Sequence, residues 1–283
     1  MSYINVNGNL LPEEKPFINR LNRCLRYGDG LFETLCVRYG KIGFLKDHLK
    51  RLFEGMKFLK LNLPPAFSEK DISEKIYELL KQNDFDINEN YRVRLQVFRS
   101  GGGYYAPEQN ESEYFIESEK LPYKDFKKIE SLKSVAVFRE LFLFPSILSR
   151  FKTCNSMPYV FASLFRKSKK YQEVLLVDQK QNLAECSSSN IFWCKKGKLF
   201  TPSLDTGCID GVMRKQVIKA AVNLGIQVKE VKMKLKVLTF SESVFCTNVI
   251  HGIRIISGIH AWRLNTDMEM VNNLTKKIIE NER

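Results

Sequence analysis

The sequence lacks any apolar run long enough to cross a membrane. Its longest apolar stretch, Leu141 to Leu148, is interrupted by Pro145, whereas a membrane-spanning helix needs about 20 apolar residues. The first residues have neither a basic start nor an apolar core, so no signal peptide is expected. We therefore expect a cytoplasmic protein that does not bind a membrane.

Metal-binding motifs are also scarce. The chain has three histidines, and no two of its seven cysteines have the Cys-x-x-Cys spacing, so a structural zinc site is not expected. The number of cysteines is odd, which favours free thiols in a reducing cytoplasm. We expect no metal ion.

Common nucleotide-binding and hydrolase signatures are missing as well. Gly28-Asp29-Gly30 lacks the third glycine of a dinucleotide fingerprint, and Gly101 to Gly103 is not followed by the Lys-Ser or Lys-Thr of a P-loop. Neither His-Glu-x-x-His nor Gly-x-Ser-x-Gly occurs. These absences exclude the enzyme classes that depend on those motifs.

Positive charge is in excess, with 45 Lys and Arg against 32 Asp and Glu and a net charge of +13. A polyanionic partner is one explanation. The basic residues are scattered, however, and no basic run is interleaved with stacking aromatics, so we expect no nucleic-acid partner. A non-catalytic nucleic-acid-binding protein stays as a remote alternative.

What is present indicates a globular protein of mixed α and β structure. Apolar residues make up 44% and charged residues 27% of the 283 residues, which is enough to bury a core. The charged segment from 120 to 133 lacks periodicity. We therefore predict a smaller N-terminal α/β domain over 1–119, a connecting segment over 120–133 and a larger C-terminal domain over 134–283.

Local patterns predict several elements. Strands are expected over residues 3–6, 31–37 and 91–98, the last pairing with 114–117. Apolar residues at helical spacing predict a helix from Leu45 to Met56, and Ser68 with Asp71 has the capping-box pattern of a helix over 68–82. A further helix is predicted over 211–224. Its glycine start leaves backbone amides exposed at the positive end of the helix dipole, which suits a phosphate.

Eight segments, in order, resemble one enzyme family. They are Tyr27-Gly-Asp-Gly-Leu-Phe-Glu-Thr34, Phe44-Leu-Lys-Asp-His-Leu-Lys-Arg-Leu52, Ser149-Arg-Phe-Lys152, Val174-Leu-Leu-Val-Asp178, Ala184-Glu-Cys-Ser-Ser-Ser-Asn-Ile-Phe192, Thr201-Pro202, Asp210-Gly-Val-Met-Arg214 and Phe245-Cys-Thr-Asn248. Together they resemble the class IV aminotransferases, which use pyridoxal 5′-phosphate. The resemblance implies the two-domain fold-type IV architecture, like D-amino-acid aminotransferase, with the cofactor between the domains. It also implies a homodimer.

The resemblance assigns roles to individual residues. Lys152 matches the lysine that forms a Schiff base with the cofactor and moves the proton at the substrate α-carbon. Glu185 matches the acid that pairs with the pyridine nitrogen, because a carboxylate there favours the protonated ring.

The same resemblance implies a phosphate site. Arg51 matches the phosphate-binding arginine, rather than its neighbour Lys50, since a guanidinium forms bidentate hydrogen bonds with phosphate. Val212 and Met213 would supply backbone amides, in agreement with the helix argument above. Asn248 lies in the loop that closes on the phosphate in relatives.

The substrate residues follow the family pattern less closely. Met157 stands where branched-chain aminotransferases have a tyrosine, and Tyr159 is a candidate substitute. Arg99, Tyr27 and Tyr104 are the candidate residues for binding the substrate. Tyr105 and Arg254 remain further alternatives for meeting its carboxylate.

The motifs around Glu185, Thr201 and Gly211 look most like 4-amino-4-deoxychorismate lyase. The leading prediction is therefore cleavage of 4-amino-4-deoxychorismate to 4-aminobenzoate and pyruvate, a step of folate synthesis. The alternative is an aminotransferase for D- or branched-chain amino acids with a 2-oxoacid acceptor. Both act on a small amino-carboxylate.

Overall fold

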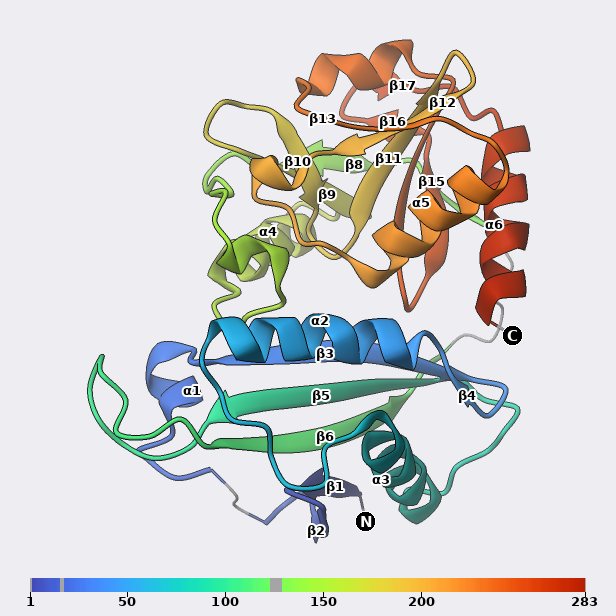
Figure 1. Ribbon diagram of the computed structural model, residues 1–283. Coiled ribbons are helices and arrows are strands. Elements are labelled where there is room, and N and C mark those ends of the chain that lie inside the picture. The colour runs from blue at the N-terminus through green and yellow to red at the C-terminus, as the bar shows by residue number, and fades with distance from the viewer. Residues whose placement is uncertain (1, 16–17, 123–128, 283) are drawn as a thin grey trace. The chain divides into compact units, whose positions relative to one another are not determined.

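The computed structural model describes residues 2–15, 18–122 and 129–282, and the chain divides into two compact units (Figure 1). The first comprises Met1–Lys124 and Phe151–Asn155, and the second comprises Asp125–Arg150 and Ser156–Arg283. Of the predicted connecting segment, residues 123–128 lie outside the described residues. The segment Phe151–Asn155, which carries Lys152, belongs to the first unit. The domain boundaries drawn from the sequence stay a prediction.

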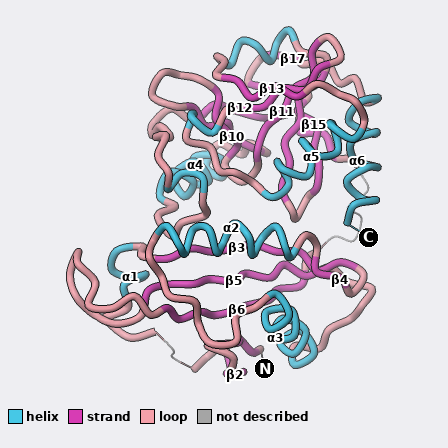
Figure 2. The backbone as a smooth tube through the Cα atoms, in the orientation of Figure 1, coloured by secondary structure: helices cyan, strands magenta, loops and turns pink. Residues whose placement is uncertain are grey.

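The first unit is built on a six-stranded antiparallel sheet with the order β2-β1-β6-β5-β3-β4, drawn in magenta in Figure 2. Its strands are β1 (Tyr3–Val6), β2 (Asn9–Pro12), β3 (Gly30–Arg38), β4 (Lys41–Ile42), β5 (Tyr91–Arg99) and β6 (Ser112–Lys120). The long strands β3 and β5 pair along their whole length, which fixes the register of the residues that they carry.

Two amphipathic helices, α2 (Leu45–Phe58) and α3 (Glu69–Gln82), cover one face of this sheet. Their apolar sides share one buried cluster with the inward residues of β3 and β5, such as Leu35 and Val93. Because strand residues alternate between faces, Phe32 and Arg94 lie on the opposite face. A short helix, α1 (Arg23–Tyr27), precedes β3 and ends at Gly28, whose φ of 66° favours glycine.

The second unit contains two sheets. The five-stranded sheet has the order β10-β9-β8-β16-β17 and the six-stranded sheet the order β13-β12-β11-β14-β15-β7. Apolar side chains of both sheets, including Leu175 and Trp193, share one buried cluster. The strands are β7 (Glu130–Leu132), β8 (Val135–Val137), β9 (Glu173–Val177), β10 (Leu183–Cys186), β11 (Asn190–Lys195), β12 (Lys198–Pro202), β13 (Val228–Val231), β14 (Ser243–Asn248), β15 (Gly252–Ile256), β16 (Gly258–Ile259) and β17 (Trp262–Arg263).

Three α-helices complete the second unit: α4 (Met157–Ser168), α5 (Val212–Asn223) and α6 (Glu269–Glu282). Short 3-10 turns occupy Leu148–Arg150, Leu204–Thr206 and Leu235–Phe240. Helix α5 packs against both α6 and β14. Within the described ranges, no helix has the length and apolar character needed to cross a membrane.

The predicted elements agree with these bounds. The predicted helices over 45–56, 68–82 and 211–224 correspond to α2, α3 and α5, and the Ser68–Asp71 capping box is formed at the start of α3. The strands predicted over 91–98 and 114–117 pair within β5 and β6. Helix α6 was not predicted.

Candidate functional site

Lys152 lies in the short segment Phe151–Asn155, which runs beside the start of β3. Its carbonyl oxygen accepts a hydrogen bond from the backbone N–H of Phe32 at 2.8 Å, and the N–H of Cys154 donates to the Gly30 carbonyl at 2.9 Å. The Nζ atom of Lys152 lies 4.7 Å from the centre of the Phe32 ring. Backbone hydrogen bonds therefore hold the segment that carries Lys152 beside β3.

The same ring contacts a second basic side chain, which the sequence analysis did not single out. The guanidinium carbon of Arg94, on β5, lies 4.0 Å from the Phe32 ring centre, and its side chain is 24% exposed. The signal was present, because Arg94 alternates with buried Val93 and Leu95 and so had to face away from the helices. Phe32 thus brings Lys152 and Arg94 to one place on the first unit.

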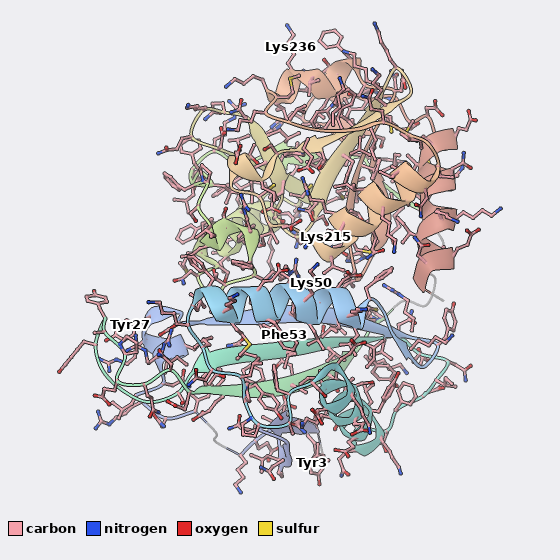
Figure 3. The ribbon with its side chains drawn as sticks, in the orientation of Figure 1. Tyr3, Tyr27, Lys50, Phe53, Lys215 and Lys236 are labelled. Carbon is pink, nitrogen blue, oxygen red and sulfur yellow. The ribbon has the colours of Figure 1, made fainter. Side chains whose placement is uncertain are left out.

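Arg51 is buried on α2 and binds a carboxylate. Its Nε and Nη2 atoms donate to the two oxygens of Glu33 at 2.8 and 2.5 Å. His48, one turn earlier on α2, places Nδ1 2.7 Å from the same carboxylate. Lys50, labelled on α2 in Figure 3, is exposed. Of the two neighbouring basic residues, only Arg51 is therefore held rigidly.

Charge interactions define the protonation states of this cluster. Burial alone would raise the pKa of Glu33, but the Arg51 charge and the hydrogen bonds from His48 and Arg51 outweigh burial and lower the pKa to about 2. Burial lowers the pKa of His48 against the opposing pull of Glu33. His48 is therefore neutral near pH 7, with Nδ1–H donating to Glu33. Its buried Nε2 atom has no hydrogen-bond partner within the described part of the chain.

Arg99, a predicted substrate residue, has its donors engaged by the protein. Its guanidinium donates to Asp29 at 2.9 Å, to Asn110 at 2.6 Å and to the Leu59 carbonyl at 2.6 Å. The residue is 5% exposed. These contacts join the end of β5 to the α1–β3 turn and to the end of α2, so Arg99 stabilises this corner of the first unit.

Tyr27 and Tyr104 lie together in an aromatic cluster of the first unit. The Tyr27 ring, labelled in Figure 3, is 5.6 Å from that of Tyr105, and the Arg26 guanidinium lies over the Tyr27 and Tyr104 rings. Tyr104 and Tyr105 are 79% and 91% exposed. The loop between β5 and β6 therefore exposes the phenol rings of Tyr104 and Tyr105.

Glu185, at the end of β10, is buried and accepts three hydrogen bonds. The Tyr159 hydroxyl donates to Oε1 at 2.6 Å and the Ile209 N–H to the same oxygen at 3.2 Å, while the Asn190 amide donates to Oε2 at 3.1 Å. Burial, and then the Glu185 charge, raise the pKa of Tyr159 well above its usual value, so its hydroxyl keeps the proton that it donates. Three donors favour the ionised carboxylate.

The start of helix α5 is joined to this carboxylate through Asn190. The Asn190 amide also donates to the Ile209 carbonyl at 2.9 Å, and a Cβ at Gly211 would lie 1.9 Å from Asn190 Oδ1. Gly211 is the N-cap and provides no side-chain cap, so the following residues, Val212 and Met213, begin the helix. Their amides are those that an α-helix leaves without intrahelical partners.

Asn248 and a buried ion pair hold the loop between Glu185 and Asn190. The Asn248 amide donates to the Ser188 carbonyl at 3.0 Å. Glu173, on β9, accepts from the Ser187 and Ser188 hydroxyls at 2.5 and 3.0 Å and pairs with Arg254 at 3.1 Å.

The Glu173–Arg254 ion pair was not predicted from the sequence, in which Arg254 was an alternative for meeting the substrate carboxylate. Arg254 lies on β15, 8% exposed, and Glu173 is 1% exposed. Arg254 is thus a structural partner of Glu173. Across the described ranges, no group of three or more potential metal ligands is found.

Comparison with known proteins identifies the relatives of this chain. It is 27% identical over 253 residues to aminodeoxychorismate lyase of Bacillus subtilis, covering 87% of this chain and 83% of that protein. It is 26% identical over 277 residues to a putative branched-chain-amino-acid aminotransferase of Methanocaldococcus jannaschii, covering 98% and 94%.

The fold has a close counterpart among solved structures. The branched-chain amino acid aminotransferase of Thermobaculum terrenum, in its PLP form, superposes with a TM-score of 0.84 at 20% identity, covering 99% of this chain and 93% of that chain. This likeness confirms the predicted mixed α/β fold.

The sequence profile of the family described as amino-transferase class IV matches residues 30–259, which is most of the chain. The match spans Lys152 as well as the Glu185 and α5 regions. The chain therefore belongs to the class IV aminotransferase family of enzymes.

Proposed function

We propose that this protein is a pyridoxal-phosphate enzyme that acts on an amino-carboxylate through Lys152. The observation that carries the proposal is the arrangement around Asn190. It joins a buried carboxylate, Glu185, to the uncapped start of α5 within one unit. A carboxylate suits a protonated pyridine nitrogen and a helix N-terminus suits a phosphate, so these residues fit the two ends of the cofactor.

When bound, the cofactor supplies an electrophilic aldehyde and a ring that accepts electrons from the substrate α-carbon. In this proposal the Lys152 amine would hold the aldehyde end and would move the proton at the α-carbon. The Glu185 carboxylate would pair with the protonated ring nitrogen. The Val212 and Met213 amides and the Arg51 guanidinium would bind the phosphate.

Other side chains set the positions of these groups. Glu33 fixes the orientation of Arg51 through two hydrogen bonds. Asn248 and Glu173 hold the serine loop that connects Glu185 to Asn190. The sequence offered Tyr159 as a substitute for the tyrosine that is absent at Met157. In this proposal Tyr159 positions Glu185 through the hydrogen bond from its hydroxyl.

We assign the substrate carboxylate to Arg94 rather than to Arg99. Arg94 contacts the same phenyl ring as Lys152 and its side chain is 24% exposed, although its Nε and Nη2 atoms donate to Gln96 at 3.0 and 2.6 Å, whereas Arg99 is 5% exposed. Arg94 therefore offers a cation near the amine that reacts. Tyr27 and Tyr104 stay predicted substrate contacts.

The leading reaction is cleavage of 4-amino-4-deoxychorismate to 4-aminobenzoate and pyruvate. The motifs around Glu185 and Gly211 and the likeness to the Bacillus subtilis lyase support it. In this reaction Lys152 removes the α-proton and the product ring becomes aromatic. The second candidate, an aminotransferase with a 2-oxoacid acceptor, is supported by the likeness to the Methanocaldococcus jannaschii protein.

We also propose a cytoplasmic homodimer. An exposed apolar stripe on α4 supports the dimer: Met157, Val160, Phe161 and Leu164 are 58%, 44%, 43% and 58% exposed. Their spacing places them on one side of the helix, and covering such a stripe with a second copy removes apolar surface from water. Seven free cysteines are compatible with a reducing compartment.

The test is release of pyruvate from 4-amino-4-deoxychorismate by cofactor-loaded protein without added 2-oxoacid. We expect rapid release by the wild type and loss of at least about a thousandfold in Lys152→Ala. Lys50→Ala is the matched control, since this exposed lysine should be dispensable.

No release from a folded, yellow wild type would contradict the lyase. Amino transfer from D- or L-amino acids to 2-oxoglutarate or pyruvate, again dependent on Lys152, would then support the second candidate. Full activity of Lys152→Ala in either assay would contradict the proposal as a whole.

A further inference from the structure

Two of the seven cysteines differ from the rest in exposure. Cys36, Cys186, Cys194, Cys208 and Cys246 are buried, whereas Cys24 and Cys154 are partly exposed. Both belong to the first unit, with Cys24 on α1 and Cys154 two residues after Lys152. Only these two thiols therefore combine free sulfur with access for a small reagent.

Backbone contacts bring the two cysteines together. The Cys154 N–H donates to the Gly30 carbonyl at 2.9 Å, and the Asn155 amide donates to the Gly28 carbonyl at 3.2 Å. Gly28 closes the one helix turn that carries Cys24. As a result Cys24 and Cys154 lie close enough for each to shift the pKa of the other.

The surroundings distinguish the two sulfurs. Cys24 Sγ also accepts from the Gln96 amide at 3.3 Å. The hydrogen bond from Cys154 and then that from Gln96 lower the pKa of Cys24 against the effect of burial, with help from the Arg94 charge, while the same hydrogen bond raises the pKa of Cys154. Cys24 is thus the better nucleophile, and Cys154 lies in place to react with it next.

A second thiol pair provides an internal comparison. Cys186 and Cys246, in the second unit, also lie close enough for each to shift the pKa of the other, but they are 1% and 0% exposed. Because oxidation requires contact between sulfur and oxidant, the buried pair should react only when the second unit opens.

We propose that Cys24 and Cys154 form an oxidisable dithiol, a modification site at which hydrogen peroxide oxidises the two thiols to a disulfide. The Cys24 thiolate attacks the peroxide, the O–O bond breaks, and a sulfenic acid and water form after protonation. Cys154 then attacks the Cys24 sulfur, an S–S bond forms and the sulfenic oxygen leaves as a second water. The two thiols are oxidised together and hydrogen peroxide is reduced to two waters.

The disulfide would join α1 covalently to the segment Phe151–Asn155. That segment carries Lys152, so the modification lies beside the amine to which we assign the chemistry. The site itself depends only on the two thiols and does not require the proposed function to be correct.

The test is hydrogen peroxide treatment of the folded full chain, followed by thiol alkylation and tryptic peptide mapping. The expected product is a cross-link between the peptides Cys24–Arg26 and Thr153–Arg166, and a dithiol reductant should reverse it. Cys24→Ser and Cys154→Ser should each abolish the cross-link, and the matched control Cys194→Ser should leave it unchanged.

The order of reaction has its own readout. In Cys154→Ser, the serine hydroxyl and the Gln96 amide can still donate to Cys24, so a sulfenic-acid reagent should label Cys24 at least about tenfold faster than it labels Cys154 in Cys24→Ser. Absence of the cross-link from folded wild type in excess peroxide would overturn the proposal. Formation of a Cys186–Cys246 disulfide at the same rate would overturn it as well. Because these readouts use peptides, they do not depend on cofactor binding or catalysis.

Discussion

Substitution of Glu33 by glutamine tests how Arg51, the arginine that we propose binds the phosphate, is held. The change keeps the shape of the side chain but removes the charge that faces buried Arg51. The pKa of Glu33 falls from 4.5 to about 2 on folding, and at about 1.4 kcal/mol per pKa unit this corresponds to about 3 kcal/mol of stability. Loss of one partner of a buried ion pair has a similar magnitude, about 3–5 kcal/mol.

The direction of the Glu33 pKa shift determines how its contribution to stability depends on pH. Because the pKa is depressed in the folded state, the stabilisation is complete above about pH 4.5 and is lost as the pH falls toward about 2. Glu33→Gln should therefore be about 3 kcal/mol less stable than wild type near pH 7. The difference should shrink as the wild-type carboxylate becomes protonated.

The assay is urea unfolding followed by far-ultraviolet circular dichroism, with hydrogen exchange of the α2 amides as the local readout. Both tryptophans, Trp193 and Trp262, lie in the second unit, so their fluorescence reports whether that unit is unaffected. Glu119→Gln is the matched control, because Glu119 pairs with Arg92 at 3.2 Å on the same sheet but is 63% exposed. The Glu119→Gln substitution should lower the free energy of unfolding by less than about 1 kcal/mol. Equal stability of Glu33→Gln and wild type at neutral pH would refute the reasoning.

Three further variants probe the second unit. Tyr159→Phe removes a 2.6 Å hydrogen bond to Glu185 and should weaken cofactor retention by roughly tenfold, measured by dialysis and the visible spectrum; an unchanged spectrum and affinity would count against the role of Tyr159. Gly211→Ala places a Cβ 1.9 Å from Asn190 Oδ1, so the amide must move and cofactor affinity should fall at least about tenfold, with unchanged affinity as the contrary outcome. Arg254→Met leaves its buried carboxylate partner unpaired and should destabilise the second unit by about 3–5 kcal/mol; a tryptophan unfolding curve that matches wild type would contradict this.

Local sequence signals predicted several elements without reference to any family. Helix α3 has both an apolar stripe and a capping box from Ser68 to Asp71, so its start was determined by neighbouring residues. Helix α6 has a comparable apolar side but was not predicted.

The buried charges were harder to predict. Glu33 stands between Leu31 and Leu35, and strand alternation placed it on the core side. A buried carboxylate at Glu33 requires a buried counter-charge. Its partner, Arg51, lies on α2, and the sequence does not show that these two residues meet. Glu173 and Arg254 are 81 residues apart, so the same reason applies to them.

Apart from the phosphate site at the glycine start of α5, the candidate site was predicted through resemblance rather than through chemistry visible in any single segment. Lys152 and Glu185 could be named because the order of motifs matched a family. The hydrogen bond from Tyr159 to Glu185 and the position of Arg94 beside Phe32 depend on tertiary packing. Motif order carries no such information.

Reductive trapping of the cofactor tests the central claim most directly. The protein is loaded with pyridoxal 5′-phosphate, reduced with borohydride and mapped by peptide mass spectrometry, with Lys152→Ala treated in parallel. The account predicts a stable pyridoxyl group on Lys152 in the wild type and none at any position in the variant. A protein that takes up no label, or that carries it on an exposed residue such as Lys50 while Lys152 stays unmodified, would contradict the account.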